Sequence, residues 1–198
     1  PPASPPPPPP RPPRWYRRRQ RQMCIRDRPD IVVAIGRGGL VPARLVCDCL
    51  DIMALTSIKI EHYLSGSSRQ AQAVIRYPLC MDIRDQRVLL VDDVNDSGDT
   101  LQLAIAHLNT FHPGEVRTAV MHHKTTTRLD VDYYARKIIK WRWLIYPWAI
   151  HEDVSAFHNR LSPPPISLEK AQQQLADQYG IRISQRCLRD IYEFMEPP

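Results

Sequence analysis

Hydrophobic residues in the middle of the chain form short continuous runs that alternate with helical patterns. A short apolar run bounded by polar or glycine-rich residues indicates a strand buried on both faces, and apolar residues recurring every three or four positions indicate an amphipathic helix. The predicted strands are residues 30–35, 54–61, 88–91 and 116–122, with 74–77 as an edge strand, and the predicted helices are 41–53 and a segment from Leu101. This alternation predicts an α/β fold with a mostly parallel sheet flanked by helices.

The most informative stretch is residues 88–100, which read VLLVDDVNDSGDT. Its apolar run leads into Asp92 and Asp93, and a loop with Ser and Gly then opens the helix at Leu101. Ligands of open α/β sheets bind beyond the carboxyl ends of the strands, and the free amides of a helix N-terminus bind phosphate. Two adjacent carboxylates beside such a site suit a sugar diol and a hard cation. The stretch therefore predicts a site for a phosphorylated ribose that carries Mg²⁺.

A second unit of strand, loop and helix occurs earlier, around the sequence Gly36-Arg37-Gly38-Gly39. Glycines allow the backbone to approach a ligand closely, and the guanidinium of Arg37 suits a diphosphate. Taken alone, a GRGG loop is just as typical of a tight turn. Paired with residues 88–100, it predicts a second anion-binding loop at the same edge of the sheet.

Two segments interrupt the alternation of strands and helices. Residues 62–73 form a polar loop of a length typical of a lid or of a disordered segment. Residues 133–148 are crowded with aromatic and basic side chains and show no clean helical period. We interpret residues 133–148 as a β-rich flap whose tryptophans fill space, and one or two of these rings can also stack on a flat heterocycle.

The C-terminal region has the pattern of two amphipathic helices joined at Tyr179-Gly180, within residues 167–195. Ser167 and Ser184 are candidate N-caps because their hydroxyls can accept from the first free amides of a helix. We predict a C-terminal helical appendage, docked or dimer-forming, with no chemistry of its own.

The positive charge of the chain is concentrated at its N-terminus. Residues 1–28 hold eight arginines and one aspartate, and subtracting this +7 from the net charge of +6 leaves −1 for the remaining 170 residues. A nearly neutral folded part does not indicate nucleic-acid binding. The same tail holds ten of the twenty prolines, which predicts an extended or disordered segment, either a non-native addition or a basic anchoring arm.

Composition also restricts location. No apolar run approaches the ~18 residues that a membrane-spanning helix needs, so no membrane partner is predicted. The five cysteines are an odd number without metal-ligand spacing, and we interpret them as reduced thiols. These observations predict a cytoplasmic protein.

Taken together, these segments resemble a known family. VLLVDDVNDSGDT resembles the signature of the type I phosphoribosyltransferases, which use 5-phosphoribosyl-1-diphosphate (PRPP). IVVAIGRGGLVPARL is similar to the diphosphate-binding loop of the xanthine-guanine and hypoxanthine-guanine branch. The residues that resemble the purine pocket of that branch are Lys124, Trp143-Leu144 and Pro147-Trp148. The resemblance covers residues 29–153.

The resemblance implies the type I phosphoribosyltransferase fold with a small hood. On this interpretation residues 1–28 are a tail, residues 29–165 are the phosphoribosyltransferase domain with its hood at about 124–160, and residues 166–198 are the helical appendage. The implied activity is Mg²⁺-dependent transfer of the phosphoribosyl group of PRPP to N9 of a 6-oxopurine in purine salvage. The resemblance also implies a homodimer or a higher homo-oligomer.

Roles for individual residues follow from the resemblance. It implies that Asp96 is catalytic and accepts the proton that leaves the purine imidazole, and that Asp93 is the partner of Mg²⁺ or of its water. Lys124 donates to the 6-oxo group, Trp143 or Trp148 stacks on the ring, and the Leu144 carbonyl accepts from the purine edge. The residues implied to bind PRPP are Arg37, Gly38, Asp92, Asp93, Asp96, Ser97, Gly98, Asp99 and Thr100.

The chain departs from the family pattern in two places that matter for the site. The xanthine-guanine enzymes have an aspartate directly after the Pro-Trp pair, where this chain has Ala149, so Glu152 or Asp153 is the candidate substitute. Asp99 adds a negative charge to a phosphate loop, which requires its carboxylate to turn outward.

Four other functions are less consistent with the sequence. A PRPP-binding regulator or RNA-binding attenuator of the same fold would have lost the chemistry, and a nearly neutral core argues against it. A phosphoribosyltransferase for a pyrimidine or adenine is opposed by Lys124 and the tryptophans. A response-regulator receiver would distribute its acids over several strands, and a Rossmann dehydrogenase would need a different glycine spacing.

Overall fold

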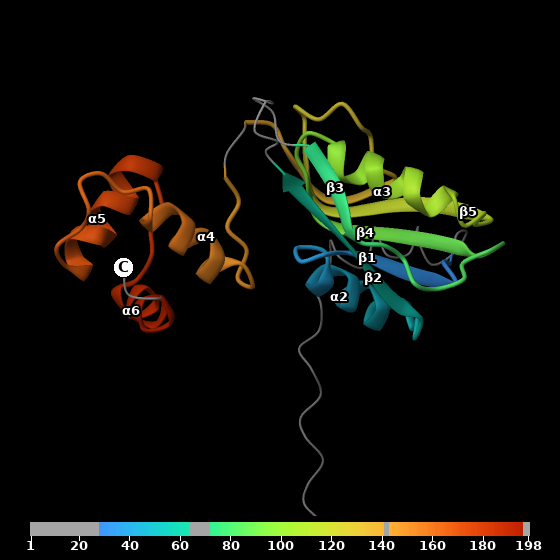
Figure 1. Cartoon of the computed structure of the whole chain (residues 1–198), viewed down its shortest axis with the longest axis horizontal. Helices are drawn as coiled ribbons and strands as arrows, with labels where there is room; N and C mark the ends of the chain where they lie inside the picture. The colour runs from blue at the N-terminus through green and yellow to red at the C-terminus, as the bar shows by residue number, and fades with distance from the viewer. Residues whose placement is uncertain (1–27, 64–71, 141–142, 196–198) are drawn as a thin grey trace, which may run out of the picture. The chain divides into compact units, whose positions relative to one another are not determined.

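The structure, a computed structural model, describes residues 28–63, 72–140 and 143–195. The predicted tail up to residue 27, and residues 64–71 of the predicted lid, lie outside the described residues. Within the described part of the chain, one six-stranded sheet has the strand order β3-β2-β1-β4-β5-β6 (Figure 1). Its strands are β1 (Ile31–Gly36), β2 (Leu55–Tyr63), β3 (Gln72–Tyr77), β4 (Arg87–Asn95), β5 (Glu115–Lys124) and β6 (Tyr133–Ile138).

The described helices are α2 (Leu40–Leu50), α3 (Asp99–Asn109), α4 (Ile150–His158), α5 (Leu168–Tyr179) and α6 (Gln185–Phe194). Helices α2 and α3 cover opposite faces of the sheet (Figure 1). Strand β3 is antiparallel to β2, and the other neighbouring strands are parallel. The prediction of a mostly parallel sheet covered on both faces is confirmed.

The side chains of β1 show how the sheet is covered. Successive residues of a strand point to opposite faces. Accordingly, Ile31, Val33 and Ile35 belong to the hydrophobic cluster that includes α3. Val32 and Ala34 belong to the cluster that includes α2. An unbroken apolar run in the sequence is therefore the consequence of burial on both faces.

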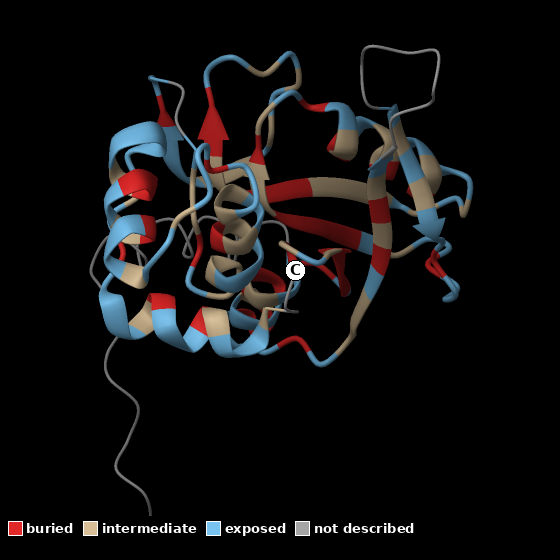
Figure 2. Ribbon diagram, turned by 60° about the vertical axis from the view of Figure 1, so that its left-hand side comes forward, coloured by how far each residue is buried: buried red, intermediate tan, exposed pale blue. Residues whose placement is uncertain are grey.

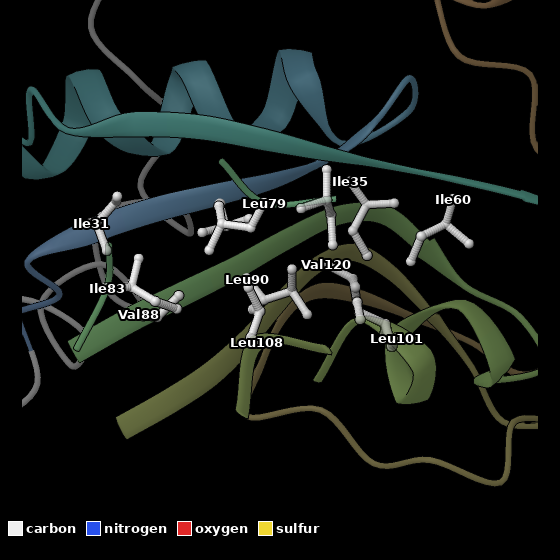
Figure 3. Close-up of a cluster of buried hydrophobic side chains, with 13 residues drawn as sticks. Ile31, Ile35, Ile60, Leu79, Ile83, Val88, Leu90, Leu101, Leu108 and Val120 are labelled. Atoms are coloured by element: carbon white, nitrogen blue, oxygen red, sulfur yellow. The ribbon is translucent and has the colours of Figure 1, made fainter. Parts of the chain in front are cut away.

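The cluster between the sheet and α3 fixes that helix to β4 (Figure 3). Leu101 and Leu108 of α3 pack in one cluster with Leu90 of β4 and Val120 of β5. Full burial of each such side chain stabilises the fold by about 1.5–3 kcal/mol. Figure 2 shows the buried residues, in red, concentrated along the strands of the sheet. Because α3 cannot shift along β4, the loop that joins them has fixed ends.

Strand β4 is longer than predicted. Its sequence pattern indicates an end at Val91, but the strand continues to Asn95 because β5 pairs along it as far as the partners Asn95 and His123. Asp92 and Asp93 therefore lie within a paired strand and not in a loop.

The prediction of residues 74–77 as an edge strand is confirmed by β3, which lies at one edge of the sheet.

The interpretation of residues 133–148 as a β-rich flap is corrected in one respect. Tyr133–Ile138 form β6, which pairs in parallel with β5 as the other edge strand of the main sheet. Helix α4 then begins at Ile150 and was not predicted. Ile150, Val154 and Phe157 pack on one side of α4 at helical spacing, but the aromatic and basic residues before them hide this short period.

The chain divides into two compact units, Pro1–Trp141 and Arg142–Pro198. In the second unit, α4, α5 and α6 share a hydrophobic cluster that includes Val154, Leu175 and Leu188. The sequence interpretation instead joined residues 142–165 to the main domain and separated residues 166–198. Shared burial of α4 with the two later helices explains why the units divide near residue 141.

Both predicted helix caps in this second unit are confirmed. The Ser167 hydroxyl accepts from the Lys170 amide at the start of α5, and the Ser184 hydroxyl accepts from the Cys187 amide at the start of α6. Gly180 ends α5 with φ 69°, in the left-handed conformation that glycine adopts without strain.

Replacing Gly39 should test how tightly the loop after β1 is packed. A Cβ at Gly39 would overlap the carbonyl oxygens of Val91 and Ile35, although its φ of −71° is ordinary. We expect Gly39→Ala to lower the free energy of unfolding by about 3 kcal/mol, because backbone cannot yield as a side chain can. Urea denaturation measures the loss.

The matched control is Gly36→Ala at the last residue of β1, just before the same loop. A Cβ at Gly36 lies 3.5 Å from the Ile58 carbonyl oxygen, an ordinary van der Waals contact, so we expect a loss within about 1 kcal/mol. Equal losses for the two variants would contradict the steric explanation.

Candidate active site at the carboxyl ends of β1, β4 and β5

Three segments that are distant in sequence meet where the central strands of the sheet end. Strands β1, β4 and β5 are parallel neighbours, so their carboxyl ends lie together. The loop 37–39 follows β1, the loop 96–98 follows β4, and Lys124 is the last residue of β5. In this way the fold brings together the residues of the first unit that the sequence assigned to a site.

The loop after β1 lies directly against β4. The Gly39 amide donates to the Ile35 carbonyl at 2.8 Å, which turns the chain back at the end of the strand. A Cβ at Gly38 would overlap the carboxylate of Asp93, so only glycine allows this approach. The Gly36–Arg37 peptide is cis, and the Arg37 side chain is exposed. The two predicted anion-binding segments are therefore in contact.

The neighbouring carboxyl groups of Asp92 and Asp93 have different surroundings. Asp92 is only 7% exposed and accepts from the Asp93 amide at 2.9 Å. Burial, together with the charge of Asp93, raises the pKa of Asp92 well above its usual range. Asp93 is half-buried against Gly38. The pair thus places two carboxyl groups, one of them largely desolvated, side by side at the end of a strand.

The segment 96–100 joins β4 to α3 through a left-handed glycine. Gly98 precedes the helix with φ 98°. The Ser97 hydroxyl donates to the Asp99 carboxylate at 3.0 Å and accepts from the Asp99 amide at 3.3 Å. Thr100 shares a hydrogen bond of 2.9 Å with His62 of β2. The first amides of α3 have no carbonyl partner within the helix, which makes this end attractive to an anion.

Asp96 and Lys124 form an ion pair across the ends of β4 and β5. The Lys124 ammonium lies 2.5 Å from an Asp96 carboxylate oxygen. The Lys124 side chain is 4% exposed and that of Asp96 is 46% exposed. A buried ammonium requires a compensating charge or hydrogen bonds. The sequence assigned both residues to the base, and the structure brings them together.

Asn95 was not predicted as a site residue. It is 1% exposed and hydrogen-bonded to three partners: Leu129, Thr127 and His123. Its only signal in the sequence is an amide at the end of a run of apolar and acidic residues, 88–94, which implies buried partners without identifying them. Its partners lie in β5 and in the turn beyond it.

The predicted purine-binding residues of the second unit are Trp143, Leu144 and Trp148. The Trp143 ring is half exposed, and its indole N–H donates to Asp153 at 3.3 Å. Burial raises the pKa of Asp153, and the bond from Trp143 partly opposes that rise. Trp148 stacks on Tyr146 at a ring distance of 4.9 Å. Leu144 is half-buried. Their role in binding a purine stays a prediction.

A metal ion at this site would take some of its oxygen ligands from water or from the phosphates of a bound substrate, and not from the protein alone. Among the described residues, no group of three or more His, Cys, Asp and Glu is arranged to hold a metal. Mg²⁺ typically binds one or two protein carboxylates together with water and substrate phosphates. Asp92 and Asp93 could supply these one or two carboxylates.

The described helices include none with the length and apolar character to cross a membrane.

Comparison with known proteins gives one consistent family. Residues 14–153 match the family model of the phosphoribosyl transferase domain. The chain is 36% identical over 118 residues to the xanthine-guanine phosphoribosyltransferase of Cereibacter sphaeroides, covering 59% of this chain and 67% of that protein. For the enzyme of the same name from a Ruegeria species, the values are 33%, 59% and 66%. The chain thus spans about two thirds of the length of these relatives.

A solved structure gives the same result. The purine phosphoribosyltransferase from Pyrococcus horikoshii superimposes with a TM-score of 0.62 and 30% sequence identity. The match covers 68% of this chain and 87% of that one.

The buried carboxyl group of Asp92 should lower the stability of the folded state at neutral pH. Its pKa is raised in the folded state, so as pH rises the unfolded chain loses the proton first and the folded state loses relative stability. We expect Asp92→Asn to raise Tm at about pH 8 and to lose this advantage toward about pH 4. Thermal unfolding at several pH values measures the effect.

Asp30→Asn is the control with the opposite sign. Arg87 lowers the pKa of Asp30 to about 2 through hydrogen bonds. Its contribution is present above the usual aspartate pKa and is lost as pH falls through about 2, so Asp30→Asn should lower Tm at neutral pH. A lower Tm for Asp92→Asn at neutral pH would contradict our interpretation of Asp92.

Proposed function

The chain belongs to the phosphoribosyl transferase domain family, and on that premise we propose that it is a purine phosphoribosyltransferase of purine salvage. It transfers the 5-phosphoribosyl group of PRPP to N9 of guanine, xanthine or hypoxanthine and releases diphosphate. The observation that carries this proposal is the ion pair of Asp96 and the buried Lys124 beside the carboxylates of Asp92 and Asp93. The xanthine-guanine and purine enzymes among the similar proteins support a purine acceptor.

The phosphate groups of PRPP bind at the two loops. Backbone amides and hydroxyls of Ser97, Gly98, Asp99 and Thr100 surround the 5′-phosphate at the N-terminus of α3. Arg37 and the backbone of Gly38 hold the diphosphate, which guanidinium donors match in geometry and charge. The close approach of Gly38 to Asp93 supports this arrangement, because the diphosphate is attached to the ribose that Asp93 binds.

Asp92 and Asp93 take the ribose hydroxyls, and Asp93 is the residue that would hold Mg²⁺ or its water. These two carboxylates fit an ion that arrives bound to the substrate, because no group of three or more potential ligands among the described residues is arranged to enclose a metal. When bound, Mg²⁺ neutralises charge on the departing diphosphate. Asp92, whose buried carboxyl has a raised pKa, holds its charge more easily once a cation is near.

Asp96 and Lys124 act on the base. Lys124 donates to the 6-oxo group, and the amino group of adenine would set donor against donor, which disfavours adenine. The N9–C1 bond forms as the bond from C1 to the diphosphate oxygen breaks, and the diphosphate leaves with the electron pair. Asp96 accepts the proton lost by the purine imidazole. The ribose passes through oxocarbenium character, as in glycoside cleavage.

The remaining contacts with the base are proposed from the resemblance to the purine branch. Trp143 or Trp148 stacks on the purine, and the Leu144 carbonyl accepts from its edge. Tyr146 covers one face of Trp148, whereas Trp143 is 53% exposed. Asp153 already accepts from Trp143, so in place of the acid missing at Ala149 it orients a stacking ring.

Several expectations about the surroundings of the enzyme stay predictions from the sequence. These are a cytoplasmic location, a homodimer or higher homo-oligomer, and the absence of nucleic-acid and membrane partners.

Asp96→Asn tests the proposed function. With PRPP, Mg²⁺ and each of guanine, xanthine, hypoxanthine and adenine, we expect the native chain to convert 6-oxopurines in preference to adenine. Asp96→Asn should lower kcat about 10²- to 10⁴-fold, because the amide oxygen can accept from Lys124 but cannot take the proton. The KM for PRPP should change by less than about twofold. Spectrophotometric initial rates measure both constants.

Asp48→Asn on α2 is the control for this experiment. Asp48 is an exposed acid paired with Arg44, so its replacement should leave kcat unchanged. If the native chain binds PRPP but converts none of the three 6-oxopurines, the proposal is wrong and a PRPP-binding regulator is the better interpretation.

The charge of Asp99 should weaken PRPP binding slightly. Its carboxylate accepts from the Ser97 hydroxyl, a group that we assign to the 5′-phosphate. We expect Asp99→Asn to lower the KM for PRPP about two- to fivefold at low salt, because water weakens the repulsion between the carboxylate and the 5′-phosphate. The gain should shrink as ionic strength rises. Initial rates at two salt concentrations measure it, and a raised KM would show that the carboxylate supports the loop.

A further inference from the structure

The turn that follows β5 packs against the loop 96–98. A Cβ at Gly98 would come within 2.8 Å of the Leu129 Cβ and 3.1 Å of the Thr127 hydroxyl. The Arg128 amide donates to the Ser97 carbonyl at 3.3 Å. Gly98 therefore has two reasons to be glycine: its positive φ and the lack of room for a side chain. Residues 125–130, which we call the supporting turn, set the position of the loop from outside.

The Asn95 amide holds the supporting turn to β4. Its nitrogen donates to the Leu129 carbonyl at 2.7 Å and lies 3.3 Å from His123 Nδ1. Its oxygen accepts from the Thr127 hydroxyl at 3.1 Å. Burial lowers the pKa of His123, which keeps its ring neutral and its Nδ1 able to accept. One buried amide thus joins β4 to the supporting turn through one donor and its acceptor, and to His123 of β5 through its other donor.

The Thr127 hydroxyl completes the link. Besides donating to Asn95, it accepts from the Leu129 amide at 3.3 Å. Loss of either side chain would leave buried partners without hydrogen bonds, and the supporting turn would have to shift to satisfy them. A shift of Thr127 or Leu129 changes the wall against which Gly98 rests.

We propose that Asn95, acting through Thr127 and Leu129, is a positioning residue for the 5′-phosphate of the substrate. It touches no substrate itself. It keeps the 96–98 loop in the shape that aims the first amides of α3 at the phosphate, and preorganised donors bind an anion better than mobile ones. The inference rests on the proposed function, because it takes this loop to be the 5′-phosphate site.

The test compares a nucleotide, GMP, with its nucleoside, guanosine; the two differ only in the 5′-phosphate. The ratio of the guanosine Kd to the GMP Kd measures the contribution of the phosphate. We expect Thr127→Val and Asn95→Leu each to reduce this ratio at least about fivefold, since hydrogen bonds to the phosphate lose their alignment. The Kd of guanosine should change by less than about twofold. Competition binding with purified full-length protein measures both constants.

Thr118→Val is the matched control. The Thr118 hydroxyl also donates to a side-chain oxygen, that of Asp132 at 2.8 Å, and accepts from a backbone amide at 3.0 Å. Thr118 lies in β5 and is 4% exposed, so the substitution should lower Tm without changing the ratio. Thr127→Val, at a half-buried position, provides the answer if Asn95→Leu fails to fold.

Two outcomes would overturn the inference in distinguishable ways. If Thr127→Val lowers Tm but leaves the ratio unchanged, Asn95 and Thr127 serve stability alone, and the proposed function stands. If the native chain does not bind GMP more tightly than guanosine, the 5′-phosphate site itself is wrong, and this inference falls with it.

Discussion

Parallel pairing of β4 with both β1 and β5 is the constraint on which the rest of the structure depends. The partners Ala34 and Val91 align the ends of β1 and β4, and the partners Asn95 and His123 align β4 with β5. These two registers place Gly38 against Asp93 and Lys124 beside Asp96. A slip of one residue would also turn buried side chains to the wrong face, so the hydrophobic core and the site are specified by the same pairing.

The sequence predicts most of the sheet because strands buried on both faces are apolar without interruption. That signal fails where polar residues are held by pairing, as at the end of β4, where Asp92 and Asn95 continue the strand. It also fails where several constraints overlap. In the edge strand Tyr133–Ile138 only Ile138 is buried, so this strand has no buried apolar run to reveal it. Helix α4 follows aromatic residues that obscure its short period.

The site is predictable to the extent that its residues are adjacent in sequence. Asp92, Asp93 and the segment 96–100 form one continuous motif. The pairing of Asp96 with Lys124 joins residues 28 apart, and only the fold brings them together. Asn95 is harder still to predict, because a single buried amide has no periodic signal and two of its three partners, Thr127 and Leu129, lie in a turn without regular secondary structure.

The C-terminal unit has a hydrophobic cluster of its own, formed by α4, α5 and α6. Under the proposed function, the stacking rings and the Leu144 carbonyl belong to this unit, whereas the groups that hold the activated sugar belong to the sheet. Stacking on the ring and the contacts with the sugar are therefore encoded in separate stretches of the gene, whereas the donor to the 6-oxo group, Lys124, stays with the sheet. Recombination between homologous genes that exchanges the second stretch would change the stacking rings and leave Lys124 and the sugar contacts in place.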